Sequence, residues 1–303
     1  MDALSTRINS LPASATLAMA AKARELKNKG IDIIGLSLGE PDFNTPEFIK
    51  EAAINAVNEN WNSYSPVDGY ADLKEAICEK FKRDNNLDYK PSQVVVSTGA
   101  KQSIANLCLV LLDPGDEVLL PAPYWVSYSA IATLAEATST IIPSTIKNDF
   151  KITPEQLEAA ITPKTKLIMF NSPNTPSGTV YTEAEYRALG QVLIKHPNIY
   201  ILSDEIYEHI NYGISHFSIA AIPELYDRTI TVNGLAKAFA MTGWRLGVAV
   251  GPKELIKKMN LILNTIVSCV PPFIQDAGIE AINGDQSILM EMKNTYFNRM
   301  NLI

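Results

Sequence analysis

The residues of this chain that could do chemistry stand just after short apolar runs. Asp204 follows one such run directly, Asn174 lies in a turn-rich loop after another, and Lys237 lies in a loop of small residues after a third. In an open parallel sheet, ligands bind outside the carboxyl ends of the strands. A carboxylate at the end of a buried strand is costly unless a cation meets it. The spacing therefore predicts a polar crevice in which an acid, an amide and an amine converge.

A second group of residues is suited to an anion. Gly99 follows the apolar run at 93–97 and leads into a helical pattern, so the free N–H groups of a helix N-terminus would face a phosphate there. Arg245, eight residues after Lys237, adds a guanidinium that can hold phosphate through two N–H groups. A plain turn between a strand and a helix is the alternative explanation of the glycine.

Each of these residues has an ordinary structural explanation when it is taken alone. A strand-end aspartate is often a helix N-cap, and an asparagine in a turn often bonds its own backbone. The joint placement at strand ends nevertheless favours a shared ligand over a set of coincidences. The residues with such alternatives are Asp204 (N-cap), Lys237 (solvated lysine), Tyr207 (core tyrosine), Arg245 (structural ion pair), Asn174 (turn residue) and Trp125 (core packing).

Together these residues suit one cofactor, pyridoxal phosphate. Its ring nitrogen needs a carboxylate to stay protonated, its aldehyde needs a lysine amine, and its phosphate needs an arginine and helix N–H donors. Tyr207 and Asn174 supply hydrogen bonds for its phenolic oxygen. Trp125, in the turn after the run at 117–120, is placed to stack on the ring. The residues therefore predict a pyridoxal phosphate site.

The elements that must position these residues follow from the apolar pattern. Near-continuous apolar runs indicate strands buried on both faces, which is typical of a parallel sheet. Helix starts are marked by Thr45 before a proline and by capping boxes that begin at Thr153 and Thr182. The alternation predicts a doubly wound α/β fold of about seven mostly parallel strands with helices on both faces. The predicted strands are 93–97, 117–120, 139–142, 166–171, 199–203, 229–233 and 247–251.

Length and composition limit the class of protein. The chain has 303 residues, of which 47% are hydrophobic and 19% charged, and its formal net charge is -7. A prior of roughly 150 residues per domain suggests two domains or one large α/β unit. This composition excludes disordered, collagen-like and disulfide-rich proteins. The acidic balance argues against nucleic acid or an anionic membrane as a partner.

The cysteines and histidines bear on compartment and on metals. Three cysteines without a CxxC pair fit a reducing cytosol, and Cys78 and Cys108 stand in helix-like apolar patterns that predict buried thiols. His196, His209 and His216 do not cluster with the cysteines, so no metal site is expected. The N-terminal stretch lacks a signal-peptide pattern, and no apolar run reaches the roughly 18 residues of a membrane span. We expect a cytoplasmic protein.

The motifs around these residues resemble those of the class I aminotransferases, in the aspartate aminotransferase superfamily of pyridoxal phosphate enzymes of fold type I. The run NGLAKAFAMTGWRLG at 233–247 matches the signature around the family's cofactor-binding lysine. The motifs GEPDF (39–43), NSPNTPSG (171–178) and SDEIYE (203–208) match its other landmarks. The likeness covers nearly the whole chain and is closest to bacterial-type aspartate aminotransferases, a group that includes aspartate/prephenate enzymes.

The resemblance implies a role for each matching position. Lys237 would form the Schiff base and move the proton, kept reactive by burial and cationic neighbours. Asp204 would pair with the ring nitrogen, and Tyr64 would reach the phosphate of a partner subunit, which implies a homodimer with shared active sites. The implied cofactor residues are Gly99, Ala100, Lys101, Trp125, Asn174, Asp204, Tyr207, Lys237, Arg245 and Tyr64, and the implied substrate residues are Gly39, Trp125, Asn174 and Lys101.

The implied reaction moves an amino group between an amino acid, expected to be L-aspartate, and a 2-oxo acid, expected to be 2-oxoglutarate. Lys101 resembles the lysine that some relatives use for the distal carboxylate of aspartate, aided by Ser14 and Thr16. Prephenate-using relatives tend to carry a lysine just before the Ser-Ala-Thr stretch. Pro12 and Ala13 stand at that place in this chain, which disfavours prephenate.

Other functions fit the same resemblance. They are an aminotransferase for aromatic or neutral amino acids, a C–S lyase, a pyridoxal phosphate-binding regulatory module and an inactive fragment. A regulator would usually carry a basic helix-turn-helix at its N-terminus, and residues 1–40 have no such pattern.

The resemblance also implies a division into domains. Residues 1–45 would form the N-terminal arm and part of a small domain, 46–284 the large cofactor-binding domain, and 285–303 the start of the interdomain helix. Nothing in 246–303 matches the family motif that supplies the arginine for the substrate α-carboxylate. A C-terminally truncated chain with an incomplete small domain is therefore expected.

Overall fold

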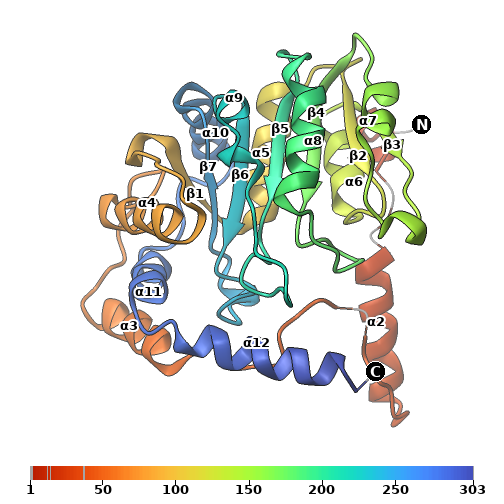
Figure 1. Cartoon of the computed structure of the whole chain (residues 1–303). Helices are drawn as coiled ribbons and strands as arrows, with labels where there is room; N and C mark the ends of the chain where they lie inside the picture. The colour runs from red at the N-terminus through yellow and green to blue at the C-terminus, as the bar shows by residue number, and fades with distance from the viewer. Residues whose placement is uncertain (1–2, 12, 14, 37, 303) are drawn as a thin grey trace.

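The computed structural model describes residues 3–11, 13, 15–36 and 38–302. A seven-stranded sheet lies at the centre of this part of the chain, in the order β1-β7-β6-β5-β4-β2-β3 (Figure 1). Its strands are β1 (Val94–Ser97), β2 (Glu117–Pro121), β3 (Thr138–Ile142), β4 (Thr165–Asn171), β5 (Tyr200–Asp204), β6 (Thr229–Gly234) and β7 (Gly247–Val250).

The sheet is mostly parallel, as the sequence predicts. Strands β3, β2, β4, β5 and β6 pair in parallel, and β7 runs antiparallel to both β6 and β1. Each of the seven predicted apolar runs forms one of these strands, with ends shifted by at most one residue. The strand β3 lies at the edge and is only partly buried, whereas β1, β6 and β7 are buried along their whole length.

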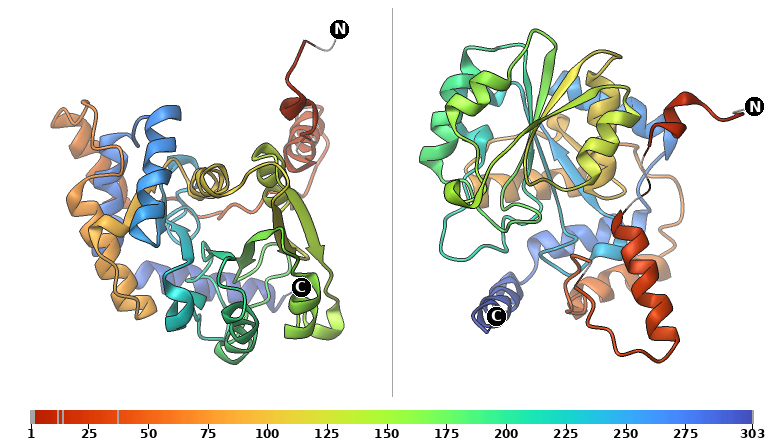
Figure 2. Two further views of the ribbon diagram at one scale, coloured as in Figure 1. Left: turned by 90° about the horizontal axis from the view of Figure 1, so that it is seen from above. Right: turned by 90° about the vertical axis from the view of Figure 1, so that its right-hand side faces the viewer.

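Helices cover both faces of the sheet, which the view from above shows most clearly (Figure 2). One face is covered by α5, α6 and α10, which share a buried apolar cluster with β2 and β6. On the other face α4 and α11 cover β1 and β7, and α7, α8 and α9 cover β4 and β5. These helices are α4 (Ala71–Asn85), α5 (Ala100–Leu111), α6 (Ser127–Leu134), α7 (Pro154–Ala160), α8 (Glu183–Ile194), α9 (Pro223–Tyr226), α10 (Lys253–Ile266) and α11 (Pro272–Asn283).

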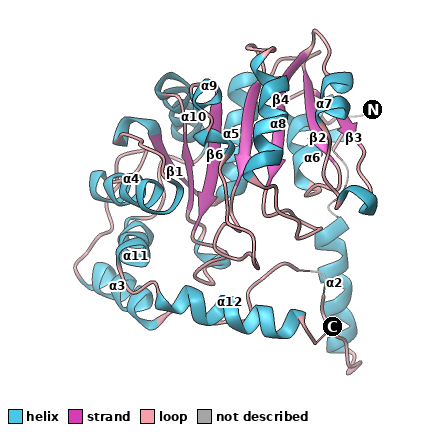
Figure 3. Cartoon of the chain, in the orientation of Figure 1, coloured by secondary structure: helices cyan, strands magenta, loops and turns pink. Residues whose placement is uncertain are grey.

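Helices α2 (Ala15–Asn28) and α12 (Ser287–Met300) lie beyond the edge at which the parallel strands end (Figures 1 and 3). The short helix α1 (Thr6–Asn9) precedes α2. Near the end of α12, Arg299 forms an ion pair with Asp42 at 2.8 Å, and Tyr296 packs edge-on against Phe43 with ring centroids 5.2 Å apart. The end of α12 is thereby joined to the segment 39–43.

The prediction that Thr45 caps a helix is wrong. Its hydroxyl donates to the carbonyl oxygen of Ala240 at 2.8 Å, and α3 (Glu47–Asn58) begins after Pro46 without a side-chain cap. The two predicted capping boxes are confirmed, because the hydroxyls of Thr153 and Thr182 each accept a hydrogen bond of 3.3 Å from the backbone N–H three residues on.

The predicted burial of the cysteines holds for one of the two. Cys108 is fully buried in the core, whereas Cys78 is only partly covered on α4. Burial raises the pKa of the Cys108 thiol to about 12 and that of Cys78 to about 11. Among the helices of the described residues, none combines the length and the apolar character needed to cross a membrane.

Candidate active site

The parallel strands β4, β5 and β6 bring three loops to one edge of the sheet. Asn171 at the end of β4 lies beside Asp204 at the end of β5, and Asp204 lies beside Val232 near the end of β6. The loops that follow these strands carry Asn174, Tyr207 and Lys237. The pairing of the strands therefore brings the three loops to the same edge of the sheet, as the sequence predicts.

Asp204 is a buried carboxylate that two hydrogen bonds hold in place. Asp204 is 4% exposed, and its side chain accepts hydrogen bonds from the Tyr128 hydroxyl at 2.5 Å and from the Ile206 N–H at 3.2 Å. Burial raises the pKa of Asp204 to about 6, although both hydrogen bonds act against the shift. Within the described part of the chain, no cationic side chain forms an ion pair with it. A protonated ring nitrogen would supply the missing positive charge.

Lys237, Tyr207 and Gly39 meet from three distant segments of the chain. The ammonium of Lys237 donates to the carbonyl oxygen of Gly39 and lies 5.5 Å from the centre of the Tyr207 ring. A Cβ atom at Gly39 would come within 3.4 Å of the Tyr207 hydroxyl oxygen. An amine and a phenol thus face a glycine that leaves room beside them, as a small-molecule site requires.

The predicted phosphate end is formed by the start of α5 and by Arg245. Gly99 precedes α5 with a positive φ of 93°, and Arg245 has the left-handed φ of 60°. The Arg245 guanidinium donates to the carbonyl oxygens of Thr242 at 2.9 Å and Thr98 at 3.3 Å. A Cβ atom at Gly99 would lie only 2.8 Å from Cζ of Arg245. Glycine therefore lets the guanidinium approach the free N–H groups of the helix, which makes a cradle for an anion.

Lys101 and Trp125 lie together next to this cradle. The Lys101 ammonium lies 4.7 Å from the centre of the Trp125 ring, which is the geometry of a cation–π contact. Burial lowers the pKa of Lys101, and the nearby positive charge of Arg245 lowers it further. Two cations that disfavour one another at a helix N-terminus favour an anion between them.

Other predicted residues are placed differently. The Asn174 amide donates to the Pro123 carbonyl oxygen at 3.2 Å, and its oxygen accepts from Ser177, so in this structure it braces its own loop and the turn before Trp125. Tyr64 is 89% exposed in the loop between α3 and α4. Pro12 and Ser14 lie outside the described residues, as does the side chain of Thr16.

Two residues of the site were missed by the sequence reasoning. Tyr128 on α6 donates to Asp204, and the Asn171 amide donates to the Asp204 carbonyl oxygen at 3.0 Å while its oxygen accepts from the Thr175 N–H at 2.6 Å. Asn171 carried a signal, because it ends a predicted strand. The contact of Tyr128 joins residues 76 positions apart and has no local signal.

Fold and crevice together define a pyridoxal phosphate-dependent enzyme of fold type I. The carboxylate at a buried strand end, the lysine beside a tyrosine and the arginine at a helix N-terminus fit the ring, the aldehyde and the phosphate of that cofactor. The chain belongs to the family of class I and II aminotransferases, whose sequence model matches residues 31–301.

Curated relatives agree with this assignment. The chain is 48% identical over 302 residues to the aspartate aminotransferase of Geobacillus stearothermophilus, which covers 99% of this chain and 77% of the relative. It is 47% identical over 305 residues to the probable aspartate/prephenate aminotransferase of Rhizobium leguminosarum bv. phaseoli, covering 100% and 76%.

Solved structures agree as well. The crystal structure of the aspartate aminotransferase from Rhizobium meliloti is similar with a TM-score of 0.96 and 44% identity, covering 99% of this chain and 75% of that one. The aspartate aminotransferase from Thermus thermophilus with maleate is similar with a TM-score of 0.97 and 41% identity, covering 100% and 79%.

Proposed function

We propose that this chain moves the amino group of L-aspartate to 2-oxoglutarate, with pyridoxal phosphate as its cofactor. The observation that carries the proposal is the buried carboxylate of Asp204, which forms no ion pair with the described residues and lies at the same sheet edge as the Lys237 loop. Relatives at 47–48% identity bear the names aspartate or aspartate/prephenate aminotransferase, which supports aspartate as the donor. When bound, the cofactor supplies an aldehyde that links to amines and a ring that takes up an electron pair from the substrate.

The residues at the ring hold the cofactor in its reactive form. The Asp204 carboxylate would accept the ring N–H and keep that nitrogen protonated, and Tyr128 holds the carboxylate in place. Tyr207 would donate to the phenolic oxygen, and Trp125 would supply an aromatic face for the ring. The Asn174 amide would join Tyr207 only after leaving the Pro123 carbonyl oxygen, to which it donates at 3.2 Å. A pair between Asp204 and the ring nitrogen would be strong because Asp204 is buried away from water.

The residues at the other end bind the phosphate and move the proton. Arg245 and the N–H groups of Ala100 and Lys101 would hold the phosphate, whereas the Gly99 N–H already donates to the Ser97 carbonyl oxygen at 2.8 Å. At its Nζ, the Lys237 amine would take the proton from Cα of the substrate and pass it on within the site. Its contact with the Gly39 carbonyl oxygen and its position at Tyr207 keep that amine at one side of the ring.

Substrate selection in this proposal rests on Lys101 and Gly39. Lys101 stands next to Trp125 and Arg245, where its charge can meet the distal carboxylate of aspartate. The Thermus relative has been solved with maleate, a dicarboxylate, which supports a site for two carboxylates. The residues at 12–13 disfavour prephenate as the acceptor, so prephenate serves as a comparison substrate.

The proposal includes a cytoplasmic homodimer. Tyr64, exposed as it is, would reach the phosphate in the partner subunit and complete a shared site. The three parts 1–45, 46–284 and 285–303 are proposed as the arm, the large domain and the start of the interdomain helix.

The test is an assay of the purified chain with pyridoxal phosphate, L-aspartate and 2-oxoglutarate, in which oxaloacetate is measured. We expect steady formation of oxaloacetate, and a loss of about 10⁴-fold in Lys237→Ala because the proton-moving amine is gone. Lys237→Ala should also lack the visible absorbance that the cofactor gains when the lysine holds it. The control is Lys257→Ala, which removes an exposed lysine of α10.

Three outcomes would contradict the proposal. Absence of oxaloacetate from the wild-type chain would overturn aspartate as donor, and turnover of a sulfur amino acid or an aromatic donor in its place would favour the alternative enzymes. Unchanged visible absorbance in Lys237→Ala would overturn the role of that lysine.

A further inference from the structure

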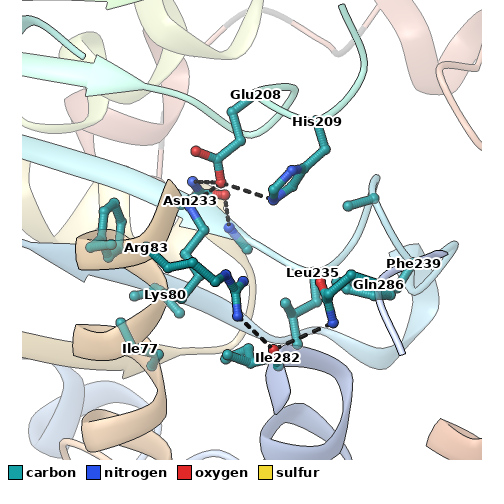
Figure 4. A pocket seen from close by; sticks show the side chains of 14 residues that line it. Ile77, Lys80, Arg83, Glu208, His209, Asn233, Leu235, Phe239, Ile282 and Gln286 are labelled. Carbon is teal, nitrogen blue, oxygen red and sulfur yellow. Dashed lines mark hydrogen bonds and ion pairs between the residues drawn. The ribbon is translucent and has the colours of Figure 1, made fainter. Parts of the chain in front are cut away.

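The loops that carry Tyr207 and Lys237 are joined by one buried carboxylate, that of Glu208. This residue is 6% exposed, and side chains on α4 and β6 donate to its two oxygens; Lys80 and Asn233 are labelled beside it in Figure 4. Lys80 on α4 forms an ion pair with it, Asn85 at the end of α4 donates at 2.7 Å, and Asn233 on β6 donates at 2.7 Å. The ring nitrogen of His209 lies 3.3 Å away.

The bond to Asn233 leads directly to the lysine loop. While the Asn233 amide nitrogen donates to Glu208, its oxygen accepts the Gly234 N–H at 2.7 Å. Gly234 is the last residue of β6, and Lys237 stands three residues further on. The loop is then closed by the Met241 N–H, which donates to the Ala236 carbonyl oxygen at 3.0 Å. A displacement of the Glu208 carboxylate would therefore move the Asn233 side chain, and with it the start of the loop that carries Lys237.

The same residue fixes the turn that carries Tyr207. The Glu208 N–H donates to the Glu205 carbonyl oxygen at 3.0 Å, and the Glu208 carbonyl oxygen accepts from the Asn211 amide at 2.6 Å. Tyr207 is the neighbour of Glu208 in sequence, so its backbone is held by the same turn. Lys237 and Tyr207 thus share one anchor, although they follow different strands.

We propose that Glu208 is a positioning residue, which sets the Lys237 amine against the Tyr207 hydroxyl through Asn233 and the 205–211 turn. The inference rests on the proposed function, because it concerns the placement of the cofactor's lysine. Supporting side chains of this kind hold reactive groups within the narrow tolerance that catalysis needs. Burial alone would raise the pKa of Glu208, but Lys80 and His209 outweigh it and hold that pKa well below its usual range.

A metal site is the competing explanation for this cluster. Oxygens of Glu205 and Glu208 and a nitrogen of His216 lie within 4.8 Å of one another. The oxygens of Glu205, however, already accept from Ser203 at 2.8 Å, from Ser218 at 2.5 Å and from His216 at 2.9 Å. Glu208 has its own donors, one of which is the ammonium of Lys80. A metal ion would have to displace the Lys80 ammonium and several hydrogen bonds, so the cluster is better suited to holding the neighbouring loops in place.

The test compares two matched asparagines that donate to the same carboxylate at the same distance. Asn233→Ala cuts the connection to the lysine loop, whereas Asn85→Ala removes an equal bond on the side of α4. Each asparagine also makes a second bond, to the Gly234 N–H and to the Lys80 ammonium respectively. The readouts are the pH midpoint of the visible absorbance of the bound cofactor, its Kd, kcat and KM separately, and thermal unfolding.

We expect Asn233→Ala to shift the pH midpoint by about one unit, because the Lys237 nitrogen is no longer held in its place beside the Tyr207 hydroxyl. We also expect kcat to fall at least about tenfold with a smaller change in KM. Asn85→Ala should leave the pH midpoint and kcat near those of the wild type, even if its melting temperature falls as much. Equal spectral shifts in both variants, or none in Asn233→Ala, would overturn the role of Glu208. Failure of the proposed function would show separately, as a wild-type chain without visible absorbance or turnover.

Discussion

At the scale of single residues, the site is organised by a charge that the protein alone does not balance. Asp204 is buried where ionisation is costly; it has two hydrogen bonds and is acted on by the charge of Lys237, but it forms no ion pair with any described residue. Such an arrangement lowers the stability of the cofactor-free chain and strengthens the binding of a cationic ring. Asp204 therefore favours cofactor binding and reduces the stability of the cofactor-free protein.

This tuning gives a prediction for Asp204→Asn. In the folded chain the pKa of Asp204 is raised to about 6, whereas in the unfolded chain it is near 4. The free-energy cost of burying the ionised carboxylate is therefore fully present above pH 6 and disappears as the pH falls towards 4. A shift of this size corresponds to about 3 kcal/mol. We expect the cofactor-free variant to be more stable than the cofactor-free wild type at pH 8 by up to that amount, and to have lost most of this advantage at pH 4.

The measurement is urea unfolding of both cofactor-free proteins at the two pH values. The variant should at the same time bind pyridoxal phosphate more weakly. An advantage of equal size at both pH values would show that the ionised carboxylate is not the cause.

At the scale of elements, the sheet was predictable and the contacts between elements were not. Every strand was visible in the sequence because a buried parallel strand is a continuous apolar run. The capping boxes at Thr153 and Thr182 were visible because their partners lie three residues away. Thr45 looked equally suitable as a cap, but its hydroxyl donates to a carbonyl oxygen 195 residues away. Local spacing cannot reveal such a competitor.

The same limit applies to the site. Residues that follow strands could be placed at one sheet edge from the sequence, since the topology fixes where strands end. Tyr128 escaped notice because it lies on α6 and reaches the end of β5 only in the folded chain. Glu208 was visible inside a family motif, yet its donors come from α4 and β6 and could not be assigned from spacing.

The packing of β7 against the start of α5 gives a prediction at this scale. A Cβ atom at Gly247 would collide with the backbone of Gly99 and Ala100, lying 2.8 Å from the Gly99 Cα. We expect Gly247→Ala to push the start of α5 away from β7, to cost about 2 kcal/mol of stability and to weaken cofactor binding at least tenfold. Gly243→Ala is the control, because a Cβ atom there meets nothing within 4 Å.

Urea unfolding and a fluorescence titration with pyridoxal phosphate would check this prediction. Weakened binding without loss of stability would point to a change at Arg245 alone. Unchanged binding in Gly247→Ala would show that the start of α5 does not hold the phosphate.

At the scale of the whole molecule, several large apolar or aromatic side chains remain uncovered. Leu36 is 91% exposed in the segment before the GEPDF motif, and Ile34 and Tyr64 are exposed to a similar degree. Leu36 and Ile34 lie close together in sequence, and an isolated chain gains nothing from exposing such side chains. This exposure supports the proposal that a second copy contributes to each site, with Tyr64 as the contributed residue.

A mixing experiment tests the shared site. Lys237→Ala and Tyr64→Ala are each expected to be weakly active or inactive as pure proteins, because each lacks one group at every site. In a dimer that contains one copy of each, both defects fall in one site and the other site has the wild-type residues. Unfolding and refolding an equal mixture should therefore recover about a quarter of wild-type activity, since about half of the dimers are mixed and each has one intact site. Sedimentation should show the dimer in both variants, and a mixture of Lys237→Ala with the exposed-lysine variant Lys257→Ala should give no recovery beyond the activity of the latter. If the first mixture yields only the sum of the separate activities while the proteins remain dimeric, Tyr64 does not act across the interface.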